Sequence, residues 1–212
     1  MRKAKFWTGD SLEWVGLLTL WAVRFTVVFM TIGRALRVFG KGSLALLSVW
    51  LSPAGRAADD GLEKMKALVH ERFPAVKHLT PSDLASWLGD TNRVAPVLLD
   101  VRSRAEFAVS HLTGARWVDP ETPALDLVPT LPTNRPVVLY CSVGYRSAQC
   151  ASRLFRVGFT NVINLEGSLF QWANEGRPLA NEGGVATRVH PYSERFGKLL
   201  KPQLRAPLDT NP

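Results

Sequence analysis

The chain reads PVVLYCSVGYRSAQCASRLFRVG from Pro136 to Gly158. Its first five residues are a continuous apolar run, which predicts a strand buried on both faces. The residues from Arg146 onward predict a helix that ends at the glycine. A lone cysteine, Cys141, therefore ends a buried strand, and a short loop separates it from the start of a helix.

This position favours a nucleophilic thiol at Cys141. The thiolate is the reactive form, and helix N-termini and nearby cations lower a cysteine pKa from about 8.5 to roughly 3.5–7.5. The unpaired amides of a first helical turn favour negative charge placed against them. Arg146 adds a cation at the same end of the helix. The alternative interpretation is an ordinary buried cysteine.

Three blocks of sequence carry a family resemblance. The Cys-x-x-Gly-x-Arg-Ser pattern of residues 141–147 resembles the active-site loop of rhodanese-type sulfurtransferases. Upstream, LLDVRSRAEF at residues 98–107 and HLTGA at residues 111–115 are similar to a second signature of that family. Residues 162–179 resemble the end of the domain. The blocks stand in the family's order and cover residues from about 76 to 180.

Two positions depart from the family pattern. Ser110 stands where a glycine is common before the histidine, and Ser168 stands where a second glycine is common. Both are small residues in predicted turns, so the expected fold is unchanged.

The resemblance implies an α/β fold, with a central, mainly parallel β-sheet flanked by helices and preceded here by apolar N-terminal helical segments. The residue pattern agrees, because residues 97–101 and 137–140 are continuous apolar runs separated by predicted helices. Thr80 and Pro81 are expected as the N-cap and first residue of one helix. Apolar residues at helical spacing predict another helix over residues 59–73.

This pattern predicts four regions. Residues 1–57 form an apolar, basic targeting or membrane-anchor region, and residues 58–75 a linker helix. Residues 76–180 form the rhodanese-like domain. Residues 181–212 form a polar, proline-containing tail that we expect to be loosely packed.

The net charge of +8 does not indicate nucleic-acid binding, because of where it lies. Residues 1–56 hold eight basic and two acidic side chains, so most of the excess flanks apolar stretches. Basic residues in that position are typical of membrane targeting and orientation. The remaining chain is close to neutral and has no basic run interleaved with aromatic residues, so we expect no nucleic-acid partner.

Two interpretations of the N-terminal region stay open beside plain amphipathic or buried helices. Residues 14–33 are long enough to span a bilayer, but Arg24 at their centre would cost about 2.5–3.5 kcal/mol. If translation starts at Met30, a basic segment, the apolar residues 43–51 and small residues before Ala58 follow in the order of a signal peptide. We therefore expect an exported, periplasmic protein or a membrane-anchored one.

The loop length favours sulfur transfer. Four residues separate Cys141 from Arg146, so the loop amides converge on the sulfur. Cysteine phosphatases resemble this site but need five residues, because their loop must hold a phosphate. The resemblance implies transfer of sulfane sulfur from thiosulfate or a persulfide, through a Cys141 persulfide, to a thiol or cyanide or to a partner sulfur-carrier protein. The alternatives are a non-catalytic docking module and, less favoured, a cysteine phosphatase or arsenate-type reductase.

No cofactor and no metal are expected. The chain has two cysteines, which excludes a disulfide framework, and four scattered histidines, which lack zinc-site spacing.

The remaining candidate residues surround Cys141. The loop supplies Ser142, Val143, Gly144, Tyr145 and Ser147, and Gly144 suits a turn with positive φ. Asp100 is expected at the end of its strand beside the loop, as a switch-point residue or as a carboxylate that bonds the loop. Arg102 and Glu106, four residues apart, are expected to pair with each other. His111 is expected to fix its loop by hydrogen bonding, and Cys150 to be packed, with a resolving thiol as the alternative.

Overall fold

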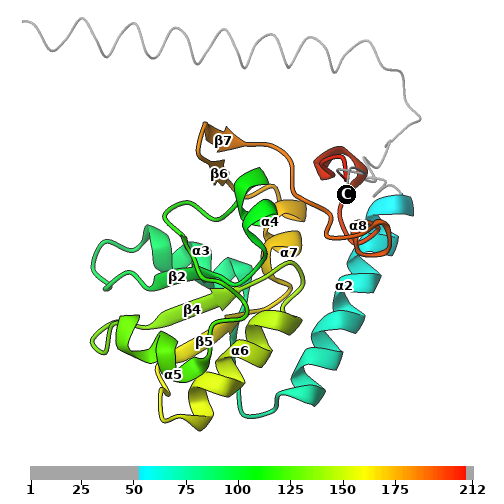
Figure 1. Cartoon of the computed structure of the whole chain (residues 1–212). Coiled ribbons are helices and arrows are strands. Elements are labelled where there is room, and N and C mark those ends of the chain that lie inside the picture. The colour runs from blue at the N-terminus through cyan, green and yellow to red at the C-terminus, as the bar shows by residue number, and fades with distance from the viewer. Residues whose placement is uncertain (1–52, 209–212) are drawn as a thin grey trace, which may run out of the picture. The chain divides into compact units, whose positions relative to one another are not determined.

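The computed structural model describes residues 53–208, which form a sheet with helices on both faces (Figure 1). The export or anchor segment expected within residues 1–57 lies almost wholly outside this range and stays a prediction. Across the described residues, none of the helices combines the length and the apolar character needed to cross a bilayer.

The central sheet has five strands in the order β1-β5-β4-β2-β3, and every neighbouring pair is parallel. The strands are β1 (Lys77–Leu79), β2 (Val97–Asp100), β3 (Arg116–Trp117), β4 (Val137–Tyr140) and β5 (Val162–Leu165). A separate antiparallel pair is formed by β6 (Leu179–Asn181) and β7 (Gly184–Ala186). The expected α/β architecture with a parallel sheet is confirmed.

The central strand β4 is buried on both faces, as its unbroken apolar run predicts. Val138 and Tyr140 belong to one hydrophobic cluster, and Val137 and Leu139 belong to the other. Successive side chains of a strand point to opposite faces, so these clusters are the two layers of core. The helices that cover them are α2 (Pro53–Arg72), α3 (Pro81–Gly89), α4 (Arg104–Val109), α5 (Ala124–Leu127), α6 (Tyr145–Arg156) and α7 (Ser168–Asn174).

Local sequence sets the helix starts near the site. Thr80 caps α3 by accepting a hydrogen bond from the Asp83 amide, with Pro81 as its first residue, as expected. Ser103 and Glu106 form a capping box at the start of α4, which satisfies two otherwise unpaired amides. The helix expected from Asp59 begins earlier, at Pro53, and is α2.

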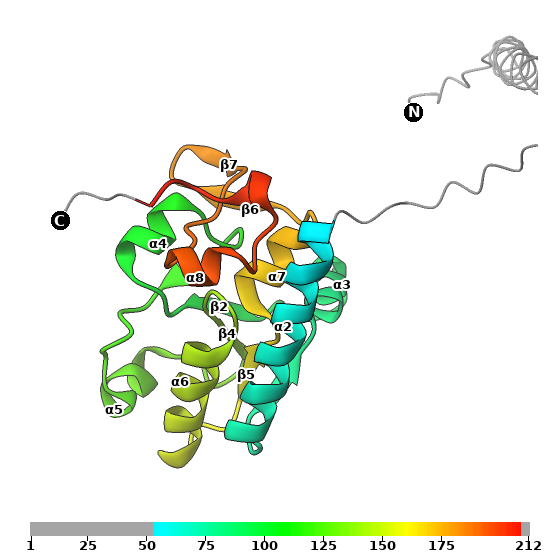
Figure 2. The same ribbon diagram turned by 90° about the vertical axis from the view of Figure 1, so that its right-hand side faces the viewer.

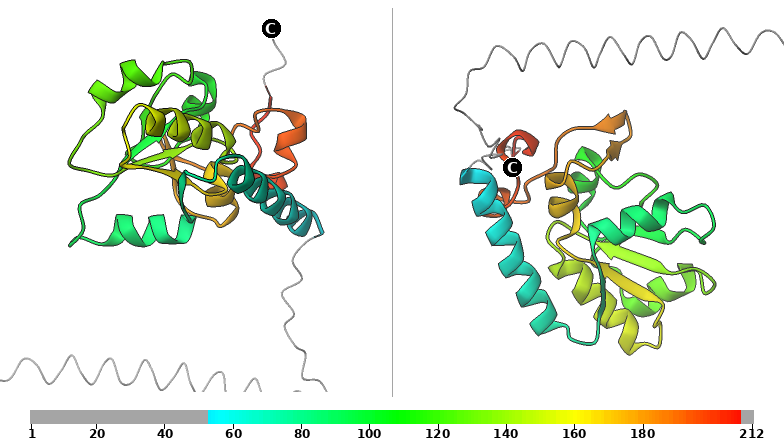
Figure 3. Two further views of the ribbon diagram at one scale, coloured as in Figure 1. Left: turned by 90° about the horizontal axis from the view of Figure 1, so that it is seen from below. Right: turned by 180° about the vertical axis from the view of Figure 1, so that it is seen from behind.

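The C-terminal segment packs on the domain, so the prediction of a loosely packed tail is wrong. Val189 and Leu200 are fully buried within the core that α7 covers. The segment contains α8 (Glu194–Gly197) and the short 3₁₀ helix η2 (Pro202–Leu204), and Leu204 of η2 packs against the same core. Another 3₁₀ helix, η1 (Val128–Thr130), lies earlier in the chain. Figures 2 and 3 show α2 running along the side of the domain.

The side chain of Asn174, on α7, fastens this segment. Its amide donates to the Leu199 carbonyl at 2.8 Å and its carbonyl accepts from the Lys201 amide at 2.9 Å. The sequence did not indicate this packing, because the apolar residues that carry it are scattered among prolines and polar residues: Val189, Phe196, Leu199, Leu200 and Leu204.

Candidate active site

Cys141 directly follows β4 at the carboxyl edge of the sheet. The neighbouring strand β2 ends at Asp100, which lies opposite Tyr140 in the register. Side chains that follow adjacent parallel strands meet at this edge, where α/β proteins bind ligands. The structure therefore brings Asp100 beside the loop, as the sequence predicts.

Gly144 lets the loop turn sharply into α6. It is the N-cap of α6 and has φ of 98°, a conformation that residues with a Cβ rarely adopt. Its amide donates to Cys141 Sγ across 3.2 Å. Gly144 therefore has the positive φ that the sequence predicts, and this conformation directs its amide toward the sulfur of Cys141.

Helix α7 holds the loop carbonyls away from the sulfur. The Leu169 amide donates to the Cys141 carbonyl at 3.1 Å, and the Phe170 amide donates to the Ser142 carbonyl at 2.9 Å. With these two acceptors engaged outside the loop, amide donors and not carbonyl oxygens face the sulfur. The loop is a preorganised site for negative charge.

The surroundings of Cys141 favour its thiolate. Burial alone would raise the pKa of this thiol, which is 1% exposed. The charge of Arg146 and hydrogen bonding from Ser147 and from the Gly144 amide outweigh burial, so the pKa lies below its ordinary value. The buried Ser147 hydroxyl bonds to no oxygen or nitrogen atom within residues 53–208, so it can rotate to donate to the sulfur.

Glu106 pairs with Arg146 and not with Arg102, so the expected pairing of Arg102 with Glu106 is wrong. The Arg146 guanidinium donates to both Glu106 oxygens, at 2.9 and 2.8 Å, and to the Ser142 hydroxyl at 3.0 Å. Ser142 in turn donates to Glu106 at 2.9 Å. Burial opposes ionisation of Glu106, but the bonds and charge of Arg146 lower its pKa to about 2.

Arg102 pairs with Asp100, two residues away, because both side chains turn into the same buried space. Their closest contact joins Arg102 Nη2 to an Asp100 oxygen at 2.7 Å, and both side chains are fully buried. Arg102 also donates to the Ser110 carbonyl. This pair ties the end of β2 to the turn after α4, which agrees with Asp100 as a carboxylate that bonds its own loop.

His111 and Cys150 occupy supporting positions. His111 Nδ1 lies 3.0 Å from the Phe107 carbonyl, and its ring stacks on Phe107 with centroids 3.9 Å apart. Its backbone exchanges two hydrogen bonds with Ala180, so it fixes the turn. Cys150 is buried within the α6 side of the core, and burial raises the pKa of its thiol.

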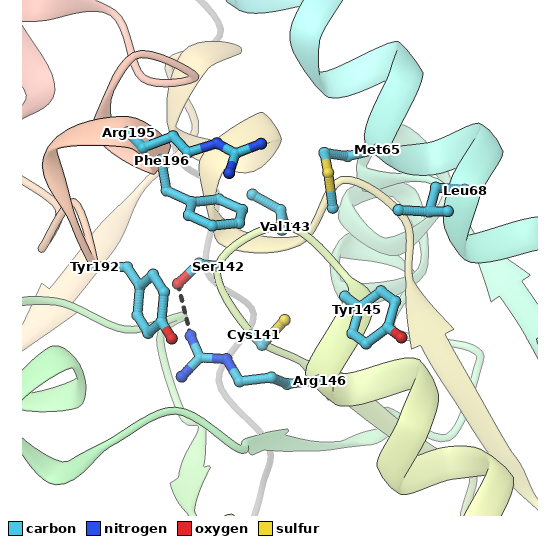
Figure 4. Close-up of a pocket in the computed structure, with 10 residues that line it drawn as sticks. All are labelled: Met65, Leu68, Cys141, Ser142, Val143, Tyr145, Arg146, Tyr192, Arg195 and Phe196. Atoms are coloured by element: carbon cyan, nitrogen blue, oxygen red, sulfur yellow. Dashed lines mark hydrogen bonds between the residues drawn. The ribbon is translucent and has the colours of Figure 1, made fainter. Parts of the chain in front are cut away.

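A cavity of about 470 Å³ opens over Cys141 (Figure 4). Four loop residues besides Cys141 line it: Ser142, Val143, Tyr145 and Arg146. The other five lining residues are Met65, Leu68, Tyr192, Arg195 and Phe196. Sequence reasoning assigned none of these five to the site. Met65 and Leu68 stand in a helical apolar pattern that indicates packing, and no motif marks residues 192–196.

Among residues 53–208, no group of three or more histidine, cysteine, aspartate or glutamate side chains is arranged to hold a metal ion.

Comparisons with known proteins place the chain in a family. Residues 80–175 match the family described as Rhodanese-like domain. A protein named Sulfurtransferase from Allochromatium vinosum is 32% identical over 113 residues, which cover 51% of this chain and 99% of that protein. The chain belongs to the rhodanese-like family.

Other proteins similar to this chain match over shorter shares of their own length. A probable adenylyltransferase/sulfurtransferase MoeZ from Mycobacterium tuberculosis is 30% identical over 125 residues, and the chain spans only 29% of that protein. Thiosulfate sulfurtransferase GlpE from Pseudomonas aeruginosa is 31% identical over 75 residues, 67% of its length. A solved rhodanese-like domain from Anabaena has 26% identity and a TM-score of 0.45, covering 49% of this chain and 78% of that one.

Proposed function

We propose that this protein is a sulfurtransferase that carries sulfane sulfur on Cys141. The observation that supports this most is the bond from the Gly144 amide to Cys141 Sγ, at 3.2 Å, in a loop of only four residues between Cys141 and Arg146. A loop this short surrounds one sulfur atom and leaves no room for a four-oxygen anion. Relatives named sulfurtransferases support the same class of activity.

The first step is attack of the Cys141 thiolate on the outer sulfur of a donor. A bond forms between the two sulfurs, the bond from that outer sulfur to the rest of the donor breaks, and the electron pair leaves with the remainder. With thiosulfate the remainder is sulfite. The product on the enzyme is a Cys141 persulfide, which the loop amides and the start of α6 stabilise as an anion.

The second step returns Cys141 to the thiolate. A thiolate or cyanide attacks the outer sulfur of the persulfide, and the bond to Cys141 Sγ breaks with its electron pair on the cysteine. The thiol acceptor is a small molecule or a partner sulfur-carrier protein. Glu106 and Ser142 hold Arg146 in place during both steps, so its charge stays beside the sulfur.

Formation of thiocyanate from cyanide tests this function, with thiosulfate and glutathione persulfide as donors. We expect the Cys141→Ser variant to lose activity by more than about a thousandfold, because Cys141 is the one thiol among the cavity-lining residues of the described range 53–208. Cys150→Ser should keep most activity, since Cys150 is packed against the core. Persistent thiocyanate formation by the Cys141→Ser variant would contradict the proposal.

We also propose that residues 1–57 place the domain outside the cytosol or at the membrane. The support is the order of basic, apolar and small residues in that region. N-terminal sequencing and fractionation of the protein from its own cells test this. A full-length protein in the cytosolic fraction would overturn it.

A further inference from the structure

The walls of the cavity over Cys141 come from outside the segment that matches the rhodanese-like family. Residues 80–175 contribute the loop, whereas α2 contributes Met65 and Leu68 and the segment around α8 contributes Tyr192, Arg195 and Phe196. We call these five residues the flanking wall. Figure 4 shows Met65 and Leu68 on one side of the loop and Tyr192 and Phe196 on the other.

The flanking wall is fixed in place by the rest of the domain. Met65, Phe196 and Leu199 pack against the buried core cluster. Gly61 lies so close to the Leu199 side chain that an added Cβ would collide with it, so α2 and the C-terminal segment are in close contact. At the other end of α2, His70 Nε2 lies 2.7 Å from a Glu166 oxygen. The wall is therefore a built surface of the cavity.

Tyr192 stands in a conformation that a bulky side chain rarely adopts. Its φ is 65°, in the left-handed region. In this conformation the centre of the Tyr192 ring lies 4.7 Å from the Arg146 guanidinium. The ring is also edge-on to the Phe196 ring, and the two ring centroids are 5.4 Å apart. Such backbone strain persists where the surroundings impose it, and it gathers at ligand sites.

The chemistry of the cavity suits an apolar body next to an anionic end. Met65, Leu68, Val143 and Phe196 present apolar surface, and the two tyrosines add ring faces. The charge of Arg146 is already paired with Glu106. Arg195, exposed and outside the salt bridges found among residues 53–208, is the remaining cation.

A small dianion such as thiosulfate would contact little of the cavity surface. Thiosulfate would fill little of the 470 Å³ and, with its outer sulfur at the loop, would leave the apolar side chains of the flanking wall uncovered. A donor with an apolar organic body would bury that body against the flanking wall while its terminal sulfur reaches the loop.

We infer that the flanking wall selects a sulfur donor with an apolar organic body over thiosulfate and other small donors. This rests on the proposed sulfur transfer through Cys141. The thiolate bonds to the outer sulfur, the bond between that sulfur and the inner sulfur of the donor breaks, and the electron pair stays on the inner sulfur, which leaves with the organic group. With a hydropersulfide donor the leaving group is a thiolate, and with a thiosulfonate donor it is a sulfinate. The step therefore needs no oxidant or reductant.

Two probes with the same reacting group test this: benzenethiosulfonate and methanethiosulfonate. Each donates its terminal sulfur, and thiocyanate formed from cyanide gives kcat/KM. The ratio of the two values is compared between variants, so differences in leaving group cancel. The wild type should favour benzenethiosulfonate, and Leu68→Ala and Phe196→Ala should each lower that ratio by about tenfold, as removal of apolar contact from a binding pocket does.

Leu88→Ala is the matched control. Leu88 is 40% exposed and Leu68 is 44% exposed, but Leu88 lies on α3 beside a different cavity. Its ratio should equal that of the wild type. An unchanged ratio in both wall variants, with activity retained, would overturn the inference and leave the proposed function intact. Absence of thiocyanate from every donor in the wild type would overturn both.

Discussion

Ser168 supports the cysteine loop at the cost of backbone strain. Its φ is 50°, a left-handed value, and its buried hydroxyl accepts from the Cys141 amide at 3.1 Å and donates to the Leu165 carbonyl at 2.9 Å. The family resemblance has glycine in this position, which would adopt such a φ freely. The serine replaces that freedom with a hydrogen bond to the cysteine.

Replacing Ser168 separates the two effects. Ser168→Ala keeps the strain and leaves the Cys141 amide unpaired, so the free energy of unfolding should fall by about 1–3 kcal/mol. Ser168→Gly loses the same bond but relieves about 1 kcal/mol of strain, so it should be the milder change. Urea unfolding of both variants measures this. If Ser168→Gly were less stable than Ser168→Ala, the backbone at this position would not be strained.

At the scale of elements, Glu106 joins α4 to the loop and to α6 through Arg146 and Ser142. The sequence could not predict this pairing, because Glu106 and Arg146 are 40 residues apart and only the fold brings them together. The spacing of four residues in the sequence suggested Arg102 instead. Local patterns predict caps and strand runs well, but they do not show which of several nearby charges a buried side chain meets.

The Glu106 pairing predicts a pH dependence of stability. Its folded pKa of about 2 lies below the unfolded value of 4.5, so the carboxylate stabilises the fold fully above pH 4.5 and loses this effect as the pH falls toward 2. Glu106→Gln should therefore lower the free energy of unfolding by about 3 kcal/mol at pH 7. Below pH 4.5 this difference from the wild type should shrink as the pH falls. Urea unfolding at several pH values measures the difference.

Glu175→Gln is the control for that series. Glu175 also pairs with an arginine, Arg177 at 2.6 Å, but the pair is partly exposed. Exposed pairs contribute about 0–1 kcal/mol, so this variant should stay close to the wild type. A constant difference between Glu106→Gln and the wild type from pH 7 to pH 3 would count against a buried, ionised Glu106.

At the scale of the whole molecule, the family segment supplies the loop and the flanking segments supply the rest of the cavity. The sheet, its parallel pairing and the loop position were predictable, because contiguous motifs and apolar runs encode them. The closing of the cavity by Tyr192 and Phe196 was not, because it depends on how a segment rich in proline and polar residues folds back.

The burial of that segment predicts its energetic weight. Leu200 is fully buried, so Leu200→Ala should lower the free energy of unfolding by about 2–5 kcal/mol. Leu125→Ala removes the same atoms from a side chain that is 70% exposed and should change stability by less than about 0.5 kcal/mol. Thermal unfolding of both variants decides the matter, and equal effects would show that the segment is not part of the core.

Mass spectrometry of the protein after exposure to a sulfur donor tests the central claim most directly. The protein is incubated with thiosulfate and, separately, with benzenethiosulfonate, then freed of donor, digested and mapped. We predict a gain of one sulfur atom on the peptide that holds Cys141, lost again when cyanide is added. Protein that gains no sulfur from either donor, or gains it on Cys150, would contradict the account.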